Sequence, residues 1–415
     1  MSTAPFACRS CGARGLKPIL SLGHSPLANS LPTADQVNEA ERTYPLDLVF
    51  CPACTLVQIT ETVPPEILFH DYLYFSSFSD TVLENARALA EQLMVRAHLT
   101  SESRVIEIAS NDGYLLKNYK VRGIEVIGIE PAHNVAQVAI AAGIPTIVEF
   151  FDIPLSERLV AEGKRADLIH AHNVVAHVAD LHGVVGGIAH LLKPDGVAVI
   201  ENHYVKAMID YTEFDSIYHE HLCYYSATSF KNLFAAHNLA LVDVEIIPVH
   251  GGSLRVYFQR NDGPKSFAQE GGERVRALLN EEVAWGVANY DFYKGFGKKV
   301  ERLRDELTAL LKDIKSEGKK IAIYGASAKS STLLNYFGIG KETIEYVVDR
   351  STAKQGRFTP GTHLPIYAPE KLLQTHPDYT LLLTWNFVDE ILHQQEAYRS
   401  QGGKFIIPIP ELRII

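Results

Sequence analysis

The sequence predicts an α/β protein built around a doubly wound parallel sheet, with a metal-binding segment before the sheet and a second, smaller Rossmann-like unit after it. Four of the five cysteines form two C-x2-C pairs within the first 54 residues. Five short runs rich in β-branched residues then alternate with helical patterns between residues 104 and 202, and a strand, turn and helix pattern returns at residue 320. Such alternation is typical of parallel sheets with helices on both faces.

Composition and charge exclude several partners. The 415-residue chain has 39 lysines and arginines against 49 aspartates and glutamates, and no dense basic block, so nucleic acid is not expected as a partner. No stretch reaches about 18 uninterrupted apolar residues, and residues 1–12 lack a charged and then apolar leader. We therefore expect a cytoplasmic protein that does not contact a membrane. The sequence leaves the oligomeric state open.

The patterns divide the chain into four parts. A zinc-binding domain is predicted for residues 1–68 and the doubly wound domain for residues 69–262. Residues 263–318 are predicted as a helical connector, in which one helix runs from Glu273 to Glu317. A Rossmann-like domain is predicted for residues 319–415.

The central domain is expected to contain five parallel strands followed by a hairpin. The parallel strands are predicted at residues 104–109, 126–130, 146–151, 166–173 and 196–202. Two further strand patterns, 239–250 and 253–260, are joined by two glycines, which is typical of an antiparallel hairpin at the edge of a sheet.

The two cysteine pairs, Cys8 with Cys11 and Cys51 with Cys54, have the spacing that lets two thiolates bind one tetrahedral metal ion. Free thiols or a redox pair are the alternatives, but no other cysteine precedes Cys223, and the paired spacing favours zinc. Because four thiolates fill the coordination shell, the zinc is expected to be structural, with the chemistry elsewhere. Cys223 stands alone and is expected to be a small packed side chain.

Acidic residues follow the first two strands of the central sheet, where ligands of such sheets bind. The turn from Glu107 to Gly113 has a single glycine, whereas a dinucleotide needs a three-glycine turn against a helix, so a dinucleotide is disfavoured. The second strand ends in Glu130, whose carboxylate can accept both hydroxyls of a ribose. The pattern favours the cationic cofactor S-adenosylmethionine over an interpretation of Asp112 and Glu130 as solvated loop carboxylates.

Two histidine-containing runs, Asn173 to His177 and Tyr218 to His221, are expected near the position of methyl transfer. Histidine supplies an acid–base group near neutral pKa, and tyrosine supplies a hydroxyl donor. A metal site at His219 and His221 is disfavoured, because their spacing is short and no accompanying metal motif occurs.

Five segments resemble the zinc-containing sugar C-methyltransferases of deoxysugar biosynthesis: VIEIASNDGYLL (105–116), VIGIEPAHNVA (126–136), HNVVAHVADL (172–181), YHEHLCYYS (218–226) and HGGSLRVY (250–257). The resemblance covers the whole chain. It implies a class I methyltransferase fold for the central domain, S-adenosylmethionine as methyl donor, and a nucleotide-linked 4-keto-hexose as the acceptor, methylated at a ring carbon beside the ketone. The run from Glu201 to Tyr204 departs from the family pattern by being more polar.

The resemblance also implies roles for individual residues. The methionine end of the cofactor would be held by Glu107, Ser110, Asp112 and Gly113, the ribose by Glu130, and the adenine would be flanked by Phe150 or Phe151. Methylation at carbon, which the resemblance implies, requires removal of a proton from a weakly acidic carbon and donors for the enolate charge. The last histidine of the YHEH run, His221, would be the base. Around the keto sugar would lie Tyr218, Glu220, His177 and Asn173, of which Asn173 also borders the cofactor.

The C-terminal unit has one glycine, Gly325, in its first turn, so NAD fits it poorly. Backbone N–H groups of this turn, with Ser327, Lys329 or Ser330, could still hold a phosphate. By resemblance the domain closes over the nucleotide sugar. The candidates for diphosphate or base contacts are Lys329, Asp349, Arg350 and Lys354, and for any single surface lysine solvation is an equal alternative.

The expected function is S-adenosylmethionine-dependent C-methylation of a nucleotide-linked 4-keto-deoxyhexose. A nucleotide-sugar oxidoreductase and a non-catalytic, zinc-organised nucleotide-sugar-binding scaffold are the alternatives. The missing dinucleotide glycines count against the first, and the YHEH run beside a cofactor site counts against the second. The sequence does not decide between C3 and C5 as the methylated carbon, nor does it identify the nucleotide, the sugar or the pathway.

Overall fold

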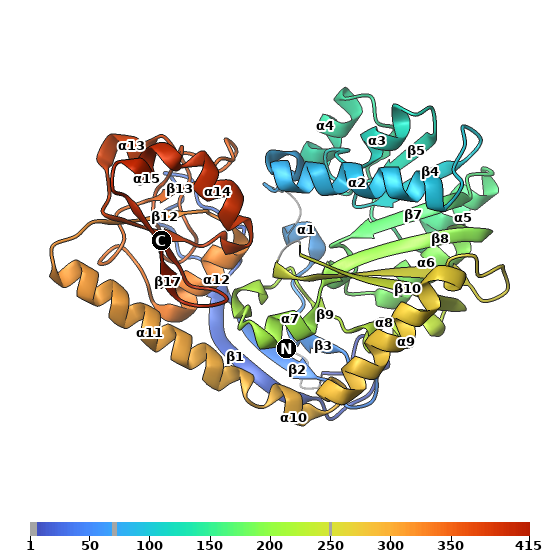
Figure 1. The fold of residues 1–415 in the computed structure, drawn as a ribbon, viewed down its shortest axis with the longest axis horizontal. Coiled ribbons are helices and arrows are strands. Elements are labelled where there is room, and N and C mark those ends of the chain that lie inside the picture. Colours follow the sequence, from blue (N-terminus) through green and yellow to red (C-terminus); the bar gives the residue numbers. More distant parts are fainter. Residues whose placement is uncertain (1–5, 69–72, 249–250) are drawn as a thin grey trace.

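The computed structural model describes residues 6–68, 73–248 and 251–415, and three sheets organise this part of the chain (Figure 1). A four-stranded sheet is formed mainly by the N-terminal segment, a seven-stranded sheet by the central segment and a six-stranded sheet by the C-terminal segment. In Figure 1 the seven-stranded and six-stranded sheets lie side by side, and the four-stranded sheet lies below and between them.

The four-stranded sheet has the order β1-β2-β3-β9 and is antiparallel. Its strands are β1 (Lys17–Pro26), β2 (Thr43–Phe50), β3 (Val57–Ile59) and β9 (Cys223–Tyr224). The strand β9 comes from the YHEHLCYYS segment, far along the chain, and sets Val57 opposite Tyr224 and Gln58 opposite Cys223. The N-terminal sheet therefore fixes the segment that carries the expected catalytic histidine. The predicted domain boundaries placed this segment in the central domain.

The seven-stranded sheet has the order β10-β11-β8-β7-β4-β5-β6. Its parallel strands are β4 (Arg104–Ile108), β5 (Glu125–Ile129), β6 (Thr146–Ile147), β7 (Ala166–His172) and β8 (Leu192–His203). The antiparallel hairpin consists of β10 (Leu239–Ile247) and β11 (Ser253–Arg260). This topology confirms the predicted doubly wound sheet and its edge hairpin, although residues 249–250 lie outside the described residues.

Helices cover both faces of this sheet. One face packs against α2 (Asp80–Arg96), α3 (Leu116–Lys120) and α4 (His133–Ala141). The other face packs against α5 (Ile153–Ala161), α6 (Leu181–Leu191) and α8 (Ala227–Ala235). The carboxyl ends of the parallel strands meet at one edge, where ligands of such sheets bind.

The third strand is shorter than predicted, because β6 ends at Ile147 and the expected strand reached residue 151. The chain leaves the sheet here to begin α5. Asp152 caps this helix by accepting a hydrogen bond from the Leu155 backbone N–H at 2.9 Å, and Pro154 stands in the first turn. Residues 148–151 lead into this capped helix and therefore do not continue the hydrogen-bond ladder of the edge strand β6.

The six-stranded sheet has the order β14-β13-β12-β15-β16-β17 and is parallel except for β17. Its strands are β12 (Ile321–Tyr324), β13 (Val347–Val348), β14 (Ile366–Tyr367), β15 (Tyr379–Leu382), β16 (Lys404–Ile407) and β17 (Arg413–Ile414). Its helices are α12 (Ala328–Phe337), α13 (Lys371–Thr375), α14 (Val388–Gln394) and α15 (Glu396–Ser400). The strand order reverses at β12, which confirms the predicted Rossmann-like unit.

The connector between these sheets is three helices, so the prediction of one helix from residue 273 to residue 317 is wrong. It contains α9 (Ala268–Trp285), α10 (Tyr290–Tyr293) and α11 (Phe296–Ser316), which run along the lower edge of Figure 1. Gly286 ends α9 in the left-handed conformation (φ +75°), and Asn289 caps α10. In α11 the predicted apolar stripe is buried at Val300, Leu307 and Leu311. In the described ranges, no helix is both long and apolar enough to cross a membrane.

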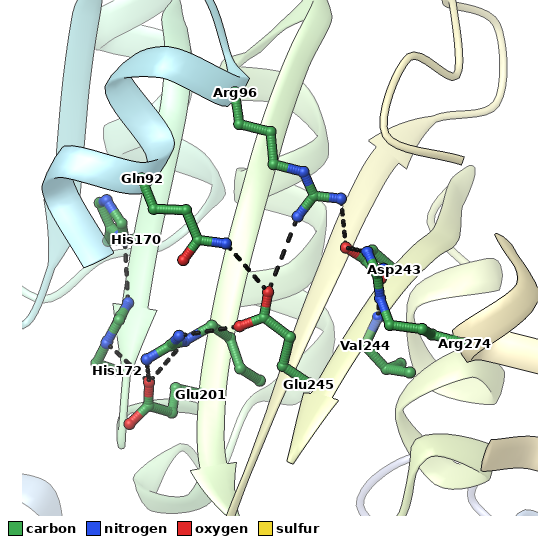
Figure 2. Close-up of polar contacts among 10 residues, drawn as sticks. Gln92, Arg96, His170, His172, Glu201, Asp243, Val244, Glu245 and Arg274 are labelled. Atoms are coloured by element: carbon green, nitrogen blue, oxygen red, sulfur yellow. Dashed lines mark hydrogen bonds and ion pairs between the residues drawn. The ribbon is translucent and has the colours of Figure 1, made fainter. Parts of the chain in front are cut away.

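A ladder of alternating charges crosses the β8, β11 and β10 strands (Figure 2). Arg255 on β11 donates to Glu201 on β8 through Nε (3.0 Å) and Nη2 (2.9 Å), and through Nη1 to Glu245 on β10 (3.1 Å). Arg96 of α2 then reaches Glu245 at 4.0 Å and also pairs with Asp243. Glu201 and Arg255 are 2% and 4% exposed, so each of these two charges depends on the other in a dry environment.

Two buried histidines extend the ladder to the far side of Glu201. Tyr119 Oη lies 2.9 Å from His170 Nε2, His170 Nδ1 lies 2.9 Å from His172 Nε2, and His172 Nδ1 lies 3.5 Å from Glu201 Oε2. Burial lowers the pKa of His170 well below its usual value and that of His172 to about 3. Each imidazole is therefore neutral with one N–H, and the donors all point from Tyr119 toward Glu201.

Arg255→Met should lower the free energy of unfolding by about 3–5 kcal/mol, because it leaves the Glu201 carboxylate buried without its partner. Urea denaturation of the variant and the wild type measures the loss. The double variant Arg255→Met/Glu201→Gln removes both charges and should recover part of that stability. Equal losses in the single and double variants would contradict the ion pair as the cause.

Candidate active site

The four cysteines of the N-terminal segment meet at one point. Their sulfur atoms all lie within 4.8 Å of one another, with Cys8 and Cys54 at 3.5 Å and Cys11 and Cys51 at 3.6 Å. Zinc bound to four thiolates at about 2.3 Å requires sulfur atoms roughly 3.8 Å apart, so the arrangement fits the ion. The predicted closed thiolate site is thus confirmed.

Both cysteine pairs sit in turns of the same form. The Gly12 N–H donates to the Cys8 carbonyl and the Thr55 N–H to the Cys51 carbonyl, each at 2.9 Å. Gly12 and Thr55 both have positive φ, +70° and +68°, and each residue turns the backbone around the preceding pair of cysteines. Cys223 is 1% exposed and, as expected, a packed side chain outside the cluster.

The end of β4 and the turn after it carry the expected cofactor residues Glu107, Ser110 and Asp112, all buried. Glu107 Oε2, Ser110 Oγ and Asp112 Oδ1 have no hydrogen-bond partner within the described residues. Burial, helped by the charges of Asp112 and Glu130, raises the pKa of Glu107 well above its usual value. Acceptors of this kind suit a cationic ligand with N–H and O–H donors, so these residues fit S-adenosylmethionine.

Glu130, at the end of β5, is tied to the same turn. Its Oε2 accepts a hydrogen bond from the Asn111 N–H at 3.0 Å and its Oε1 from the Ala132 N–H at 2.8 Å. Gly113 has φ +79°, and a Cβ atom there would stand 2.8 Å from Ile144 Cγ1, so this position requires glycine. The spatial relation of Glu130 to the turn is as the sequence predicts.

A segment before α2 lies on the cofactor turn, a contact that sequence analysis missed. The Ser76 N–H donates to Asn111 Oδ1 at 2.9 Å and the Ser77 N–H to Asp112 Oδ2 at 3.1 Å, and Asn111 Nδ2 donates to the Tyr74 carbonyl at 3.1 Å. Asn111 has a positive φ of +51°, and its side chain makes two of these three hydrogen bonds. Asparagine after a strand was the one available signal.

The two aromatic candidates for adenine lie in different environments. Phe151 is 6% exposed and packs in the core. Its ring lies 3.0 Å from the point that a Cβ atom on Gly187 of α6 would occupy. Phe150 is 46% exposed, next to the strand ends that carry Glu130. An adenine contact at either ring stays a prediction, and Phe150 is the ring open to a ligand.

Three expected catalytic side chains form one half-buried cluster. The short helix η2 (Val175–His177) follows β7 and sets His177 against His221, with ring centroids 4.7 Å apart. Tyr218 Oη lies 2.8 Å from His221 Nε2, and His221 Nδ1 lies 2.9 Å from the Ser216 carbonyl oxygen. A carbonyl only accepts, so His221 Nδ1 carries the proton and Nε2 is the basic nitrogen.

Burial lowers the pKa of His221 well below its usual value, and it lowers that of His177 to about 4. Both rings are therefore neutral. Glu220, between them in sequence, is 3% exposed, and burial raises its pKa to about 7. Asn29 of the N-terminal segment donates through Nδ2 to both Glu220 oxygens, at 2.7 and 2.9 Å, a contact without a local sequence signal.

His219 points away from the cluster. Its Nε2 lies 3.2 Å from the Pro45 carbonyl oxygen of β2, and its ring contacts that of Tyr44 at a centroid distance of 5.7 Å. His219 and His221 therefore face different units, which argues against a shared metal. Among the described residues, the four cysteines are the only group of three or more potential ligands that converge.

Asn173 borders a small pocket at the ends of β7 and β8. It has φ +54°, and its N–H donates to the Glu201 carbonyl at 2.7 Å. The pocket is lined by Asn173, His172, Glu201 and Tyr114, with α2 side chains opposite. Asn173 thus shares a pocket with Tyr114, which follows the turn after β4.

Of the four expected nucleotide contacts, Lys329 lies beside the cluster. Its Nζ is 4.3 Å from the centre of the Trp385 ring, and Trp385 Nε1 donates to Asp215 Oδ2 at 2.7 Å. Asp349 accepts hydrogen bonds from the backbone N–H groups of Ala326 and Ser351, both at 2.8 Å.

The other two basic candidates contact the protein. Lys354 is 7% exposed and donates to the Ala326 carbonyl at 2.9 Å. Arg350 donates to Glu390 of α14 at 2.9 Å and faces Asp80 of α2 at 3.6 Å, so it joins the C-terminal unit to the central one. Sequence reasoning missed this use of Arg350, because its partners are distant in the chain.

Three family models match the chain: a zinc binding domain at residues 8–69, a methyltransferase domain at residues 82–244 and a C-methyltransferase C-terminal domain at residues 248–410. C-methyltransferase NovU of Streptomyces niveus is 35% identical over 408 residues, which cover 98% of this chain and 96% of NovU. The chain belongs to this family of zinc-containing C-methyltransferases. The protein is therefore an enzyme that uses S-adenosylmethionine to methylate carbon and holds a structural zinc.

Two more distant similarities are restricted to part of the chain. The ubiquinone biosynthesis O-methyltransferase of Rhodopseudomonas palustris (strain HaA2) is 31% identical over 103 residues, which are 23% of this chain and 38% of that protein. A solved S-adenosylmethionine-dependent methyltransferase from Clostridium acetobutylicum ATCC 824 is 11% identical, with a TM-score of 0.35, and covers 44% of this chain and 92% of its own. The family resemblance stated from the five motifs is confirmed by the match to NovU and by the family models.

Purified enzyme should contain one zinc ion per chain, because four thiolates supply a closed shell. Elemental analysis measures the ratio. Cys51→Ser should lose the zinc and destabilise the N-terminal sheet, since structural zinc contributes folding free energy. Cys223→Ser changes a cysteine outside the cluster and should keep the zinc. A ratio near zero in folded, active wild type would contradict the site.

Glu130→Ala should weaken S-adenosylmethionine binding by about 1.5–3 kcal/mol, the usual scale for hydrogen bonds to a charged group. Titration calorimetry measures the affinity, and NAD should give no heat of binding. Glu149→Ala is the matched control, because Glu149 is exposed and pairs with Arg158 at the surface. Unaltered affinity in Glu130→Ala would mean that the ribose is held elsewhere.

Proposed function

We propose that the enzyme methylates a ring carbon beside the ketone of a nucleotide-linked 4-keto-deoxyhexose, and that the division of the chain at residues 68, 262 and 318 reflects its working parts. One observation carries the proposal. In the neutral histidine His221 the Nδ1–H donates to a backbone carbonyl, which leaves Nε2 as the basic nitrogen, and Nε2 lies against a phenol. A carboxyl group of raised pKa, Glu220, is next to it in the chain. Such a set suits the removal of a proton from carbon.

His221 is the proposed base. It takes the proton from the carbon beside the ketone onto Nε2. The C–H electron pair then forms the C=C bond of the enolate, and negative charge develops on the ketone oxygen. In the resting protein Tyr218 Oη occupies Nε2 at 2.8 Å, so its hydroxyl must leave the histidine as substrate enters. The same hydroxyl can then donate to the developing oxyanion, as in other enzymes that stabilise enolates with a phenol. S-adenosylmethionine, when bound, supplies the electrophilic methyl group that the enolate carbon takes up.

Three further side chains surround the proposed sugar. His177 stacks edge-on against His221 and is a second donor toward the oxygen. Glu220 borders the sugar on the side of the N-terminal segment. Asn173 borders it on the side of the cofactor. Glu220 is held by Asn29, so the N-terminal unit contributes to the site as well as to folding.

The C-terminal unit is proposed to bind the nucleotide. Lys329 is the strongest of the four candidates, because it starts α12 beside the histidine cluster and its charge contributes to the lowered pKa of His221. Asp349, Arg350 and Lys354 are engaged with the protein itself. They are proposed to shape the nucleotide site, or to exchange these partners for the ligand.

Proton exchange in D2O tests the base. With a nucleotide-linked 4-keto-6-deoxyhexose and S-adenosylhomocysteine in place of the methyl donor, wild type should exchange the proton at the acceptor carbon. His221→Ala should slow the exchange by about 10²–10⁴-fold, the usual contribution of a positioned base. Tyr218→Phe should slow it by about 10²–10³-fold, the cost of one oxyanion donor. NMR of the sugar follows both rates.

His219→Ala is the matched control, because His219 faces β2 outside the cluster, and it should exchange as wild type does. If His221→Ala exchanges the proton at the wild-type rate, His221 is not the base. Glu220 would then be tested by the same exchange.

A further inference from the structure

His203, in the unusually polar run Glu201 to Tyr204, lies at the ligand-binding edge of the central sheet. It is the last residue of β8, and parallel strands of such sheets present their carboxyl ends to ligands. Residues two apart on a strand share a face, so His203 projects on the same side as Glu201. Glu201 lines the pocket that also contains His172 and Asn173.

A buried carboxylate orients the His203 ring. Glu213, 1% exposed, accepts a short hydrogen bond from His203 Nε2. Within the described part of the chain, His203 Nδ1 makes no hydrogen bond, and it is not among the buried polar atoms that lack one. The described contacts thus hold the ring by one nitrogen, and the side chain is 10% exposed.

The segment that orients His203 also orients the proposed base. The short helix η3 (Phe214–Ser216) begins directly after Glu213 and ends at Ser216, whose carbonyl holds His221 Nδ1 at 2.9 Å. Between them Asp215 is 1% exposed, and its Oδ1 has no partner among the described residues. One rigid turn therefore holds the two imidazoles in a fixed relation. Consistent with their proximity, the charge of His203 contributes to the lowered pKa of His221.

The turn is closed from the side of the C-terminal unit. Trp385 donates to Asp215 at 2.7 Å, and a Cβ atom on Gly251 would stand 2.6 Å from Glu213 Oε1 and 2.5 Å from Trp385 Cη2. Glycine at this position lets the tryptophan and the carboxylate approach each other. Glu213 and Trp385 therefore both pack against the backbone at Gly251.

We propose that His203 determines sugar specificity by forming a hydrogen bond through Nδ1 to a ring hydroxyl of the acceptor. This inference rests on the proposed function. A hydroxyl is the substituent that suits the site, because it can donate to the neutral imidazole or accept from the protonated one. An ammonium group can only donate and a ketone oxygen can only accept. His203 is thus a substrate contact that distinguishes sugars by the presence of one ring hydroxyl, while His221 removes the proton from carbon.

Matched substrates and isosteric variants test this role. The probes are nucleoside-diphosphate 4-keto-6-deoxyhexoses in pairs that differ by one ring hydroxyl, at C2 or at C3, and the readout is the ratio of kcat/KM within each pair. Wild type should prefer the hydroxylated sugar of one pair by about 10- to 100-fold, because the analogue that lacks the hydroxyl leaves His203 Nδ1 without its hydrogen-bond partner. His203→Gln keeps a polar atom at the Nε2 position for Glu213 but has none at Nδ1, so the preference should fall to near one.

His203→Asn places its amide at the Nδ1 position and should keep part of the preference. His393→Ala, an exposed histidine of α14, is the control and should keep all of it. S-adenosylmethionine affinity by calorimetry should be unchanged in every variant. A His203→Gln enzyme that keeps the wild-type preference, or that loses activity equally on both sugars of the pair, contradicts the inference and leaves the proposed function standing. A wild type that methylates none of the sugars overturns the proposed function and this inference with it.

Discussion

The pairing of β9 with β3 is the contact on which the geometry of the active site depends. On one side the Ile59 N–H donates to the Leu222 carbonyl at 3.0 Å, and on the other the Leu222 N–H donates to the Ala176 carbonyl at 2.7 Å. Thr332 of the C-terminal unit donates to the Ile217 carbonyl at 3.0 Å. All three units therefore form hydrogen bonds with the backbone of the segment that carries Tyr218 and His221. The zinc lies outside the chemistry, yet it stabilises the sheet that holds this backbone in place.

Burial sets the protonation of the site in two directions. It lowers the pKa of the His221 and His177 imidazoles, so both stay neutral, and it raises the pKa of the Glu220 and Glu107 carboxyl groups. A base that is neutral well below pH 7 is ready to accept a proton. It is also weak, so the developing enolate must be stabilised by donors such as Tyr218. The same dry environment strengthens the attraction of the acidic turn for a cation.

Much of the fold was predictable because its signals are local. The cysteine spacing, the alternation of strands and helices, and the acidic turn with Glu130 each occupy a short window of sequence. The contacts that complete the site join distant residues: Asn29 holds Glu220, Glu213 holds His203, and Arg350 joins Glu390. Sequence spacing carries no information on such pairs. The break in the connector was locally signalled by Gly286, but the prediction extended the apolar stripe that begins at Val300 back across it.

The position of the new methyl group tests the central claim most directly. The enzyme would be incubated with S-adenosylmethionine labelled with 13C at the methyl group and a nucleoside-diphosphate 4-keto-6-deoxyhexose, and the product examined by carbon–proton correlation NMR. We predict a methyl carbon bonded directly to the ring carbon beside the ketone, with the signal and couplings of a C-methyl group. A methyl group on oxygen, or on a ring carbon that does not adjoin the ketone, would contradict it, because neither product requires the enolate that the His221 cluster is proposed to form.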